Sequence, residues 1–384
     1  MRKKIIIITT GWFPEGDAGA VRLKIMGKIF TECGYEVTVL CRGMYKLKGN
    51  IDNIEYISLR NFSSGLIIKI LDYIFFSSRV KNILKNNVHS IYGIYIYNAH
   101  ENLFKFCKNF SLSNKIKLYH DCVEWYSPEE YRFGKYDPWY RLKNRINTKI
   151  IDKSFSVISI STFLEEYFLK KGIFTVKVPI LCDFSSVKNI KKFHPSKVVI
   201  FYGGSPGKKD LIGNLLEGAL MLNEEEKKRI HIILIGATKE YLINVSDVSS
   251  KTIKECEKFL EIHGRMPRSE VLKRMEIANF VFLARDSDLR YAKAGFPSKV
   301  VEALAHGTPM LCNISSDLDD YLINEYNSII MKDHTPESVY MALKKILKLT
   351  LEQKKNMSLN AVKTAKEKFD YHNYIPIIKE FINR

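Results

Sequence analysis

The chain has 384 residues, of which 46% are hydrophobic and 27% are charged. This globular composition excludes a disordered or low-complexity chain, and the length suits two domains better than one. The formal net charge is +18, and residues 1–190 hold 29 Lys and Arg against 17 Asp and Glu. Such an excess favours anionic partners, which include phosphorylated substrates, an anionic membrane surface and nucleic acid. Genome composition is the alternative explanation for a chain rich in Lys, Asn and Ile.

The N-terminus is basic, but its apolar run, 5–8, is too short for the core of a signal peptide. No stretch reaches the roughly 18 to 20 uncharged apolar residues that span a bilayer. The seven cysteines lack metal-ligand or redox spacing, which fits reduced thiols used in packing. We therefore expect a cytoplasmic protein.

The first half alternates between strand and helix patterns. A β-branched run at 5–9 is followed by helical spacing at 21–30 and a second apolar run at 37–41, which is the pattern of a βαβ unit. Further strands are predicted at 88–97, 116–119 and 156–160. Residues 1–185 therefore predict a parallel sheet with helices on both faces.

The alternation restarts after a polar stretch at 186–196, which we interpret as a linker. Strands predicted at 198–202, 230–235, 280–284 and 308–312 give a second doubly wound α/β domain over 197–370. Residues 358–384 have a helical pattern broken by Pro376, and we expect the end, 371–384, to form a helix that packs back on the first domain. Ligand sites are expected at the carboxyl ends of the strands.

The densest motif runs from Ala294 to Pro309. Gly295 lets the backbone approach a ligand closely, and a helix is predicted to begin at Pro297 and Ser298. Its first amides, at Ser298 and Lys299, would face a diphosphate, with the helix dipole adding to the attraction. Glu302, one turn further along, could accept two hydrogen bonds from a ribose diol. The alternative is an ordinary capped helix before a buried strand.

This motif resembles the donor-binding signature of retaining glycosyltransferases of family 4 (glycosyl transferases group 1), in which two Glu residues lie eight positions apart around a Gly-Phe pair. The second Glu is Glu302, whereas Ala294 stands where the family has the first, which usually contacts the transferred sugar. The resemblance implies the GT-B fold, with two Rossmann-like domains facing a central cleft. It also implies retaining, metal-independent transfer from a nucleoside-diphosphate sugar, with UDP or GDP most common, and no cofactor. The acceptor would be a polysaccharide or a lipid-linked oligosaccharide, as in capsule or lipopolysaccharide biosynthesis.

Two further segments carry the donor resemblance. In 202–210 the glycine-rich turn is followed by Lys208 and Lys209, one of which matches the family's catalytic lysine, while the usual Arg near Gly204 is absent. The turn at 264–266 resembles the family's Gly-Arg turn that reads the base. The predicted donor-binding residues are therefore Gly203, Gly204, Ser205, Gly207, Arg265, Met266, Ala294, Gly295, Phe296, Pro297, Ser298, Lys299 and Glu302. A solvated loop with incidental lysines and a plain turn are the alternatives.

In the first half, Gly19 matches the family's first glycine-rich loop, which approaches the donor phosphates. His120 follows a predicted strand and resembles the family's histidine that touches the donor sugar, so it is predicted to be catalytic. Asp121, Glu124 and Trp125 are predicted to contact the acceptor, since aromatic rings stack on sugars.

The remaining features are weighed against other functions. Asp286-Ser287-Asp288 has the letters of a metal motif, but Arg285 and Arg290 beside it favour an ion-paired loop, so no metal site is predicted. The segment 66–85 pairs bulky apolar residues with cations and predicts either an interfacial membrane helix or a buried helix with a basic rim.

Three other functions stay open. A GT-B-type nucleotide-sugar epimerase would share the donor contacts. A nucleic-acid-binding protein would show exposed aromatics along a basic stripe or a known module, and neither is found. A dinucleotide-dependent dehydrogenase needs Gly-x-Gly-x-x-Gly after the first strand, whereas the glycines at 11, 16 and 19 have other spacing.

Overall fold

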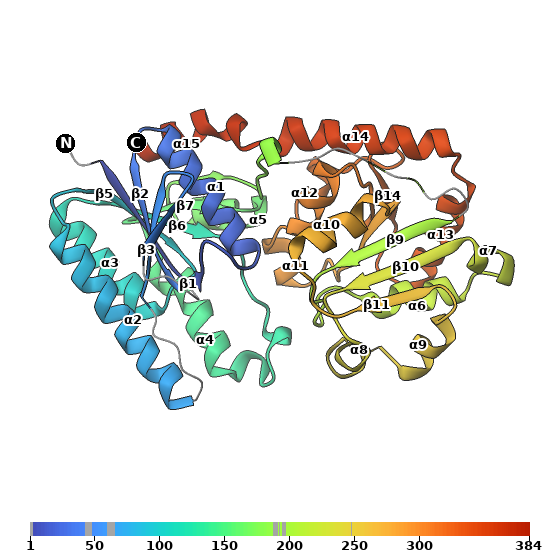
Figure 1. Cartoon of the computed structure of the whole chain (residues 1–384). Helices are drawn as coiled ribbons and strands as arrows, with labels where there is room; N and C mark the ends of the chain where they lie inside the picture. The colour runs from blue at the N-terminus through green and yellow to red at the C-terminus, as the bar shows by residue number, and fades with distance from the viewer. Residues whose placement is uncertain are drawn as a thin grey trace. The chain divides into compact units, whose positions relative to one another are not determined.

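The computed structural model describes residues 3–42, 48–59, 66–186, 191, 193, 197–246 and 248–384, with the backbone alone for 66–74. The chain forms two compact units: unit 1 is Met1–Leu181 with Tyr371–Arg384, and unit 2 is Cys182–Asp370 (Figure 1). The last 14 residues thus belong to unit 1. Most of the predicted linker, 186–196, lies outside the described residues.

Unit 1 is built on an eight-stranded sheet of order β3-β4-β2-β1-β5-β6-β7-β8. Its neighbours pair in parallel except β3 with β4, and the order reverses on either side of β1. The strands are β1 (Lys4–Trp12), β2 (Glu36–Arg42), β3 (Lys48–Ile51), β4 (Ile54–Ser58), β5 (Ile91–Tyr97), β6 (Lys117–Cys122), β7 (Ser156–Ser159) and β8 (Thr175–Lys177).

The β3–β4 hairpin was not anticipated from the sequence. Its two turn residues, Asp52 and Asn53, have φ of 51° and 62°, which is the left-handed region that a two-residue hairpin turn needs. Asp and Asn tolerate this region better than most residues, so the pair was the available signal. The hairpin adds the antiparallel edge to an otherwise parallel sheet.

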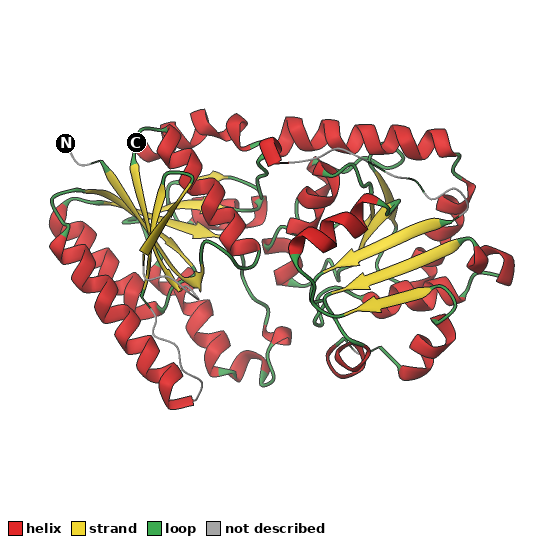
Figure 2. Ribbon diagram, viewed as in Figure 1, coloured by secondary structure: helices red, strands yellow, loops and turns green. Residues whose placement is uncertain are grey.

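Helices cover both faces of the sheet of unit 1, which Figure 2 shows in red around the yellow strands. Ile5 and Ile7 of β1 share a core with residues of α1 and α15, and α1 packs against α15. The helices are α1 (Ala18–Glu32), α2 (Leu66–Asn86), α3 (Glu101–Asn114), α4 (Pro138–Arg145), α5 (Thr162–Lys170) and α15 (Ile375–Asn383). Short helical turns are η1 (Pro128–Glu130), η2 (Gly134–Tyr136) and η3 (Ile146–Ile150).

The helical segment expected to break at Pro376 is interrupted earlier, between Phe369 and Ile375. The long helix α14 ends at Phe369, a 3-10 turn covers Tyr371–Tyr374, and Pro376 lies in the first turn of α15. A proline lacks the amide hydrogen that a helix interior needs, whereas first-turn amides have no intrahelical partner in any case. Pro376 therefore begins the last helix instead of interrupting it.

Unit 2 is built on a six-stranded parallel sheet of order β11-β10-β9-β12-β13-β14, which reverses between β9 and β12. The strands are β9 (Val198–Gly203), β10 (Ile230–Ile235), β11 (Leu260–His263), β12 (Phe280–Leu283), β13 (Met310–Asn313) and β14 (Ser328–Met331). This is the doubly wound order, in which ligands bind beyond the carboxyl ends of the strands at the reversal.

Unit 2 has its own core, in which Ile200 of β9 and Leu234 of β10 pack with α6, α9 and α13. The helices are α6 (Ile212–Leu220), α7 (Glu224–Lys228), α8 (Lys239–Val245), α9 (Ser250–Cys256), α10 (Arg268–Glu276), α11 (Arg290–Ala294), α12 (Ser298–Ala305), α13 (Pro336–Lys348) and α14 (Leu351–Phe369).

The segment 66–85, for which either an interfacial membrane helix or a buried helix with a basic rim was predicted, coincides with α2. The side chains of its apolar half, 66–74, lie outside the described residues. In the described half, Phe76, Val80 and Leu84 are buried, and Arg79 donates a hydrogen bond of 2.6 Å to the Leu59 carbonyl. Over the part of the chain that is described, no helix combines the length and the hydrophobicity that crossing a bilayer requires.

Candidate functional site

The glycine-rich loop after β9 lies at the reversal of the sheet of unit 2. Gly204 has φ of 135° and Gly236, at the end of β10, has φ of 106°, both in the region that favours glycine. A Cβ on Gly236 would lie 2.5 Å from the Gly204 carbonyl oxygen, so the two loops are in backbone contact. A Cβ on Gly204 would in turn lie 2.8 Å from Cε of Lys299, so this loop is packed against the lysine side chain.

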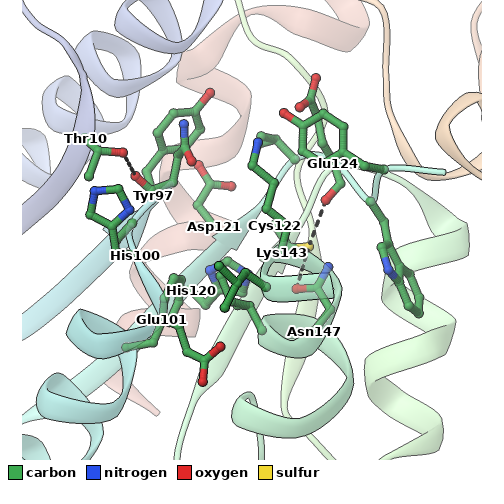
Figure 3. A pocket seen from close by; sticks show the side chains of 18 of the residues that line it. Thr10, Tyr97, His100, Glu101, His120, Asp121, Cys122, Glu124, Lys143 and Asn147 are labelled. Atoms are coloured by element: carbon green, nitrogen blue, oxygen red, sulfur yellow. Dashed lines mark hydrogen bonds between the residues drawn. The ribbon is translucent and has the colours of Figure 1, made fainter. Parts of the chain in front are cut away.

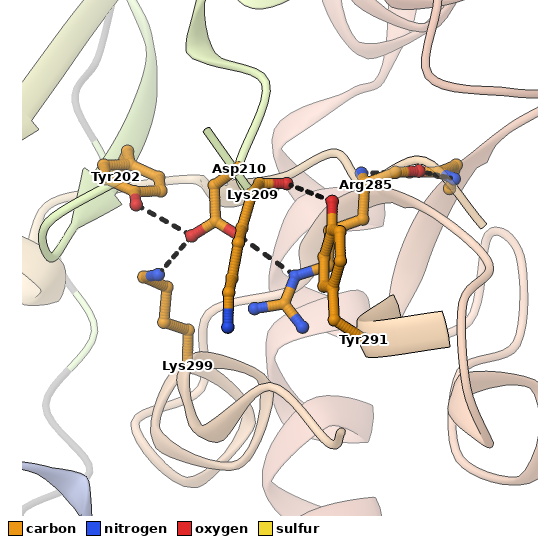
Figure 4. Close-up of polar contacts among 7 residues, drawn as sticks. Tyr202, Lys209, Asp210, Arg285, Tyr291 and Lys299 are labelled. Atoms are coloured by element: carbon orange, nitrogen blue, oxygen red, sulfur yellow. Dashed lines mark hydrogen bonds and ion pairs between the residues drawn. The ribbon is translucent and has the colours of Figure 1, made fainter. Parts of the chain in front are cut away.

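A buried carboxylate organises the cations at this position. Asp210 accepts from Lys299 Nζ at 2.5 Å and from Arg285 Nε at 3.0 Å, and its exposed fraction is 3% (Figure 4). The Tyr202 hydroxyl donates to the same carboxylate at 2.8 Å. We call Asp210, Arg285 and Lys299 the cation cluster. Its members come from the loop after β9, the loop after β12 and the first turn of α12.

The cation cluster carries a net positive charge at neutral pH. Burial alone would raise the pKa of Asp210, but Lys299 and Arg285 lower it below the usual range of a carboxyl group. One carboxylate therefore balances one of two cations. Lys209, which points its amine to the ring of Tyr291 at 5.4 Å from the centroid, and the exposed Lys208 lie on the same loop.

The helix predicted after Pro297 is α12, which runs from Ser298 to Ala305. Proline at the N-cap has no side-chain acceptor, so it does not cap the amides of the first turn. The side chain of Phe296 is buried against Tyr321 and Phe369, with ring centroids 5.4 and 5.9 Å apart. Of the predicted donor-binding set, Phe296 therefore offers a ligand its backbone only. Ala294 is fully buried.

Glu302 lies on α12 and forms an ion pair with Arg268, the first residue of α10. The Arg268 side chain is exposed, whereas that of Glu302 is largely covered. Arg265 is exposed, and Met266 is partly buried. Sequence reasoning placed Glu302 in the site without its partner, because nothing in the spacing of α10 and α12 indicates the contact.

Unit 1 contains a separate cavity of about 390 Å³ (Figure 3). It lies at the reversal of that sheet, where Thr10 follows the buried part of β1 and Tyr97 ends β5. The lining residues are Thr10, Arg42, Tyr97, Asn98, Ala99, His100, Glu101, Phe104, His120, Asp121, Cys122, Val123, Glu124, Trp125, Tyr126, Trp139, Leu142, Lys143, Asn144, Ile146 and Asn147. The four predicted residues of β6 and the loop after it, 120, 121, 124 and 125, are among them.

His120 lies inside β6, not after it, which corrects the expectation. Its ring is buried edge-on to Phe104, and Nδ1 lies 3.3 Å from the Ile96 carbonyl oxygen. Because a carbonyl only accepts, this contact puts the proton on Nδ1 and leaves a lone pair on Nε2. Within the described chain, Nε2 has no hydrogen-bond partner. Burial lowers the pKa of His120 to about 4, so the ring is neutral at pH 7.

Asp121 does not offer a free carboxylate to the cavity. It accepts from Arg22 Nε at 2.7 Å and Nη2 at 2.8 Å, and from the Tyr95 hydroxyl at 2.5 Å. This bidentate, fully buried pair ties α1 to β6. We therefore revise Asp121 from an acceptor ligand to a residue that positions the strand.

Gly19 lies in the first turn of α1, where the carboxylate of the N-cap residue Asp17 accepts from its amide at 2.9 Å. The amide that was expected to approach a phosphate is thus engaged. A Cβ on Gly19 would lie 2.8 Å from the Tyr97 hydroxyl, so the glycine allows this close packing.

Glu124 and Trp125 differ in exposure. Glu124 is exposed, whereas Trp125 is buried, donates from Nε1 to Asn144 at 2.8 Å and packs against Tyr167. Trp125 therefore lines the cavity of unit 1 with only part of its ring, because the rest packs against neighbouring residues.

The residues that sequence reasoning missed are Asp210, Arg285 and Tyr202. Arg285 was expected to pair with Asp286 and Asp288, but its Nε bonds to Asp210, while Asp286 accepts from the Asp288 amide. The available signal was position, since Tyr202, Asp210 and Arg285 lie at or just after the ends of β9 and β12.

A protein-family match lies within unit 2. Residues 184–364 match the model of the family described as "Glycosyl transferases group 1". A curated relative, an uncharacterized glycosyltransferase of Methanocaldococcus jannaschii, is 19% identical over 260 residues, which is 64% of this chain and 62% of that protein's length. The chain thus spans less than two thirds of this relative.

Solved structures resemble the whole chain. HepE of Anabaena in complex with UDP and glucose has a TM-score of 0.69 at 14% identity and covers 99% of both chains. Sucrose-phosphate synthase of Thermosynechococcus elongatus has a TM-score of 0.74 at 13% identity, covering 100% of this chain and 98% of its own. WaaG, a glycosyltransferase involved in lipopolysaccharide biosynthesis, has a TM-score of 0.69 at 14% identity, with coverages of 98% and 99%.

The fold is therefore the α/β GT-B type, with two doubly wound units, as the sequence predicted. Residues 184–364, which match the model described as "Glycosyl transferases group 1", make up nearly all of unit 2.

Proposed function

We propose that this protein is a glycosyltransferase that moves a sugar from a nucleoside-diphosphate sugar to a polysaccharide or lipid-linked oligosaccharide. The cation cluster is the observation that carries the proposal. It places a surplus of positive charge at the sheet reversal of a glycosyl transferases group 1 domain, beside the uncapped first turn of α12. A diphosphate is the ligand chemistry that this arrangement favours.

In the proposed donor complex, Lys299 and Arg285 face the diphosphate together with Lys208 or Lys209. The chain lacks an Arg near Gly204, so Arg285 and Lys299 supply that charge from other elements. Asp210 holds both side chains in place before the donor binds, which lowers the reorganisation that binding requires. When the donor binds, the Glu302 carboxylate releases Arg268 and accepts hydrogen bonds from the two hydroxyls of the ribose.

Catalysis would come from stabilising the charge on the departing diphosphate and from positioning the acceptor hydroxyl. We propose retention through attack on the same face, with side-chain cations and helix amides in the role that a divalent ion has in other transferases. Arg265 and Met266 approach the base of UDP or GDP. Because Ala294 stands where the family has a Glu, the transferred sugar meets one carboxylate fewer than in the family pattern. His120 Nε2, a lone-pair acceptor, fits a sugar hydroxyl as its donor partner.

The acceptor is proposed to enter the cavity of unit 1. Its walls combine aromatic rings, among them Tyr126 and Trp139, with polar groups such as Asn98 and Asn147. Such a mixture suits sugar rings, which present apolar faces and hydroxyl edges.

The test is titration calorimetry of the purified chain with UDP, GDP, UMP and uridine, in EDTA and in MgCl₂. We expect one diphosphate to bind in EDTA. Arg285→Gln and Lys299→Met should each weaken that diphosphate at least about tenfold, because a charge-assisted contact to phosphate contributes about 1.5 to 3 kcal/mol. The nucleoside should bind all variants alike. Product analysis with the matching nucleotide sugar then distinguishes transfer from epimerisation.

Lys344→Met is the matched control, because Lys344 also pairs with a carboxylate, Glu226 of α7, but α7 directly precedes β10 and so lies at the amino end of the sheet, away from the carboxyl ends where the cluster lies. It should bind the diphosphate as the wild type does. Absence of any diphosphate binding to the wild type would refute the function. Binding that depends on MgCl₂ would refute the metal-independent mechanism alone.

A further inference from the structure

Four large apolar side chains are exposed in one short stretch of unit 1. They are Phe133 (63% exposed), Tyr136 (72%), Trp139 (66%) and Leu142 (43%), and we call them the aromatic patch. Soluble surfaces seldom gather apolar side chains in this way, and such patches mark sites of interaction with a protein, a membrane or a ligand.

The local structure explains why these side chains point outward. Phe133 is the N-cap of the 3-10 turn η2 and Tyr136 is its last residue, and residues three apart in such a turn lie on the same side. Asp137 caps α4 by accepting from the Trp139 amide at 2.9 Å, and Trp139 and Leu142 then share one face of that helix. Tyr140 lies on the opposite side and is buried. Tyr140 therefore packs into unit 1, whereas the side chains of the aromatic patch face solvent and can contact another molecule.

Cations lie beside two rings of the aromatic patch. Residues 131–145 contain five Lys or Arg and a single acidic residue, Asp137, which is buried as the helix cap. Arg132 lies over the ring of Phe133 at 5.7 Å, and Lys135 lies over Tyr136 at 5.3 Å. Long cationic side chains alongside exposed aromatic rings are the composition that suits the boundary of an anionic bilayer.

The aromatic patch is continuous with the cavity of unit 1. Trp139 and Leu142 belong to both. Lys143, next along α4, also lines the cavity and is labelled in Figure 3. A surface that received the aromatic patch would therefore lie at one wall of the cavity.

We propose that the η2–α4 segment, residues 132–143, docks unit 1 on an anionic lipid surface. The aromatic patch inserts at the headgroup level, and Arg132, Lys135 and Arg141 contact the anionic headgroups. Docking brings the cavity to the lipid surface, where an acceptor carried by a lipid anchor would reach it. This last step rests on the proposed function, whereas the docking itself does not. The segment is distinct from the apolar stretch at 66–74.

The experiment is co-sedimentation of the full chain with vesicles of phosphatidylcholine containing 30% phosphatidylglycerol, and with phosphatidylcholine alone, at 50 mM and 500 mM salt. The wild type should bind the anionic vesicles at low salt and release them at high salt. Phe133→Ser with Tyr136→Ser should lower the partition coefficient by roughly a hundredfold or more, since two aromatic side chains lose their burial. Arg132→Ala with Lys135→Ala should lower it by roughly 25-fold at low salt.

The matched control is Met341→Ser with Leu359→Ser, which removes two apolar side chains of unit 2 with exposures of 65% and 68%. This variant should bind vesicles as the wild type does. Trp139 gives an independent readout, because the other two tryptophans, Trp12 and Trp125, are less exposed. Its emission should shift to the blue with anionic vesicles and be quenched by brominated lipid, and Trp139→Phe should remove both signals.

Each result decides the docking proposal. It is overturned if the wild type stays in the supernatant with anionic vesicles, or if Phe133→Ser with Tyr136→Ser leaves the partition unchanged. A Trp139 response to a neutral soluble oligosaccharide, with none to vesicles, would overturn it in favour of a glycan-binding face. Binding of UDP and of GDP is measured in the same samples. Absence of vesicle binding with normal binding of one diphosphate refutes docking alone, and vesicle binding without binding of either diphosphate refutes the proposed function alone.

Discussion

Replacement of Asp210 by Asn tests whether the cation cluster is held together by its carboxylate. The substitution keeps the shape of the side chain but removes the charge that faces Lys299 at 2.5 Å and Arg285 at 3.0 Å. Asp210 is 3% exposed, while the two cations retain 20% and 13% exposure and can turn partly to solvent. Breaking a buried ion pair costs about 3 to 5 kcal/mol, and because the cations are partly exposed the expected loss of stability is about 3 kcal/mol.

The assay is urea and thermal unfolding of the full chain. A loss of about 3 kcal/mol corresponds to a fall of about 6 to 12 °C in the unfolding temperature of a unit of this size. The variant should also bind the diphosphate more weakly, although it has one negative charge fewer, because Lys299 and Arg285 lose their fixed positions. Tighter binding would mean that the net charge outweighs orientation.

The pH dependence has a defined sign. The folded-state pKa of Asp210 is lowered, so its contribution is present above the unfolded-state pKa, about 3.9, and disappears as the pH falls further. The difference between wild type and Asp210→Asn should be constant from pH 5 to 8 and shrink below about pH 4. Glu270→Gln removes an exposed pair with Lys273 and serves as the control, with no expected change in the unfolding temperature. If Asp210→Asn unfolds within 1 kcal/mol of the wild type at pH 7, the carboxylate does not hold the cluster.

Two more predictions concern the loops and the cavity. Gly236→Ala should destabilise unit 2 by several kcal/mol in urea unfolding, because the added Cβ would lie 2.5 Å from the Gly204 carbonyl oxygen and the residue has φ of 106°. The control is Gly213→Ala in helix α6, whose added Cβ would lie 3.8 Å from the nearest atom, and it should stabilise unit 2 by up to about 1 kcal/mol. Equal effects of the two substitutions would contradict the geometry. Burial lowers the pKa of His120 to about 4, so between pH 6.5 and 4 the unfolded chain is protonated at this residue while the folded chain is not, and stability should fall as the pH falls through this range. His120→Gln should flatten that part of the pH profile of the unfolding temperature. An unchanged slope would refute a buried neutral ring.

The sequence alone determined the alternation of elements. The apolar runs at 5–9, 37–41, 198–202 and 230–235 all became strands, because burial on both faces of a parallel sheet demands continuous β-branched and aliphatic residues. The helix after Pro297 was equally local, since proline and serine suit a first turn and the apolar spacing that follows fits one helical face. Two doubly wound units follow from such short-range patterns.

Only the tertiary structure decided which side chains meet. Asp210 lies 75 residues from Arg285 and 89 from Lys299, and Arg22 lies 99 from Asp121. These contacts arise from the order in which parallel strands line up, which brings distant loops to one edge of a sheet. Exposure is decided in the same way. Trp125 and Trp139 are the same residue type, but Trp125 is buried beside Tyr167, whereas Trp139 is exposed. A periodic pattern reports the face of its own element, whereas charge pairing and exposure depend on neighbours that the local sequence does not contain.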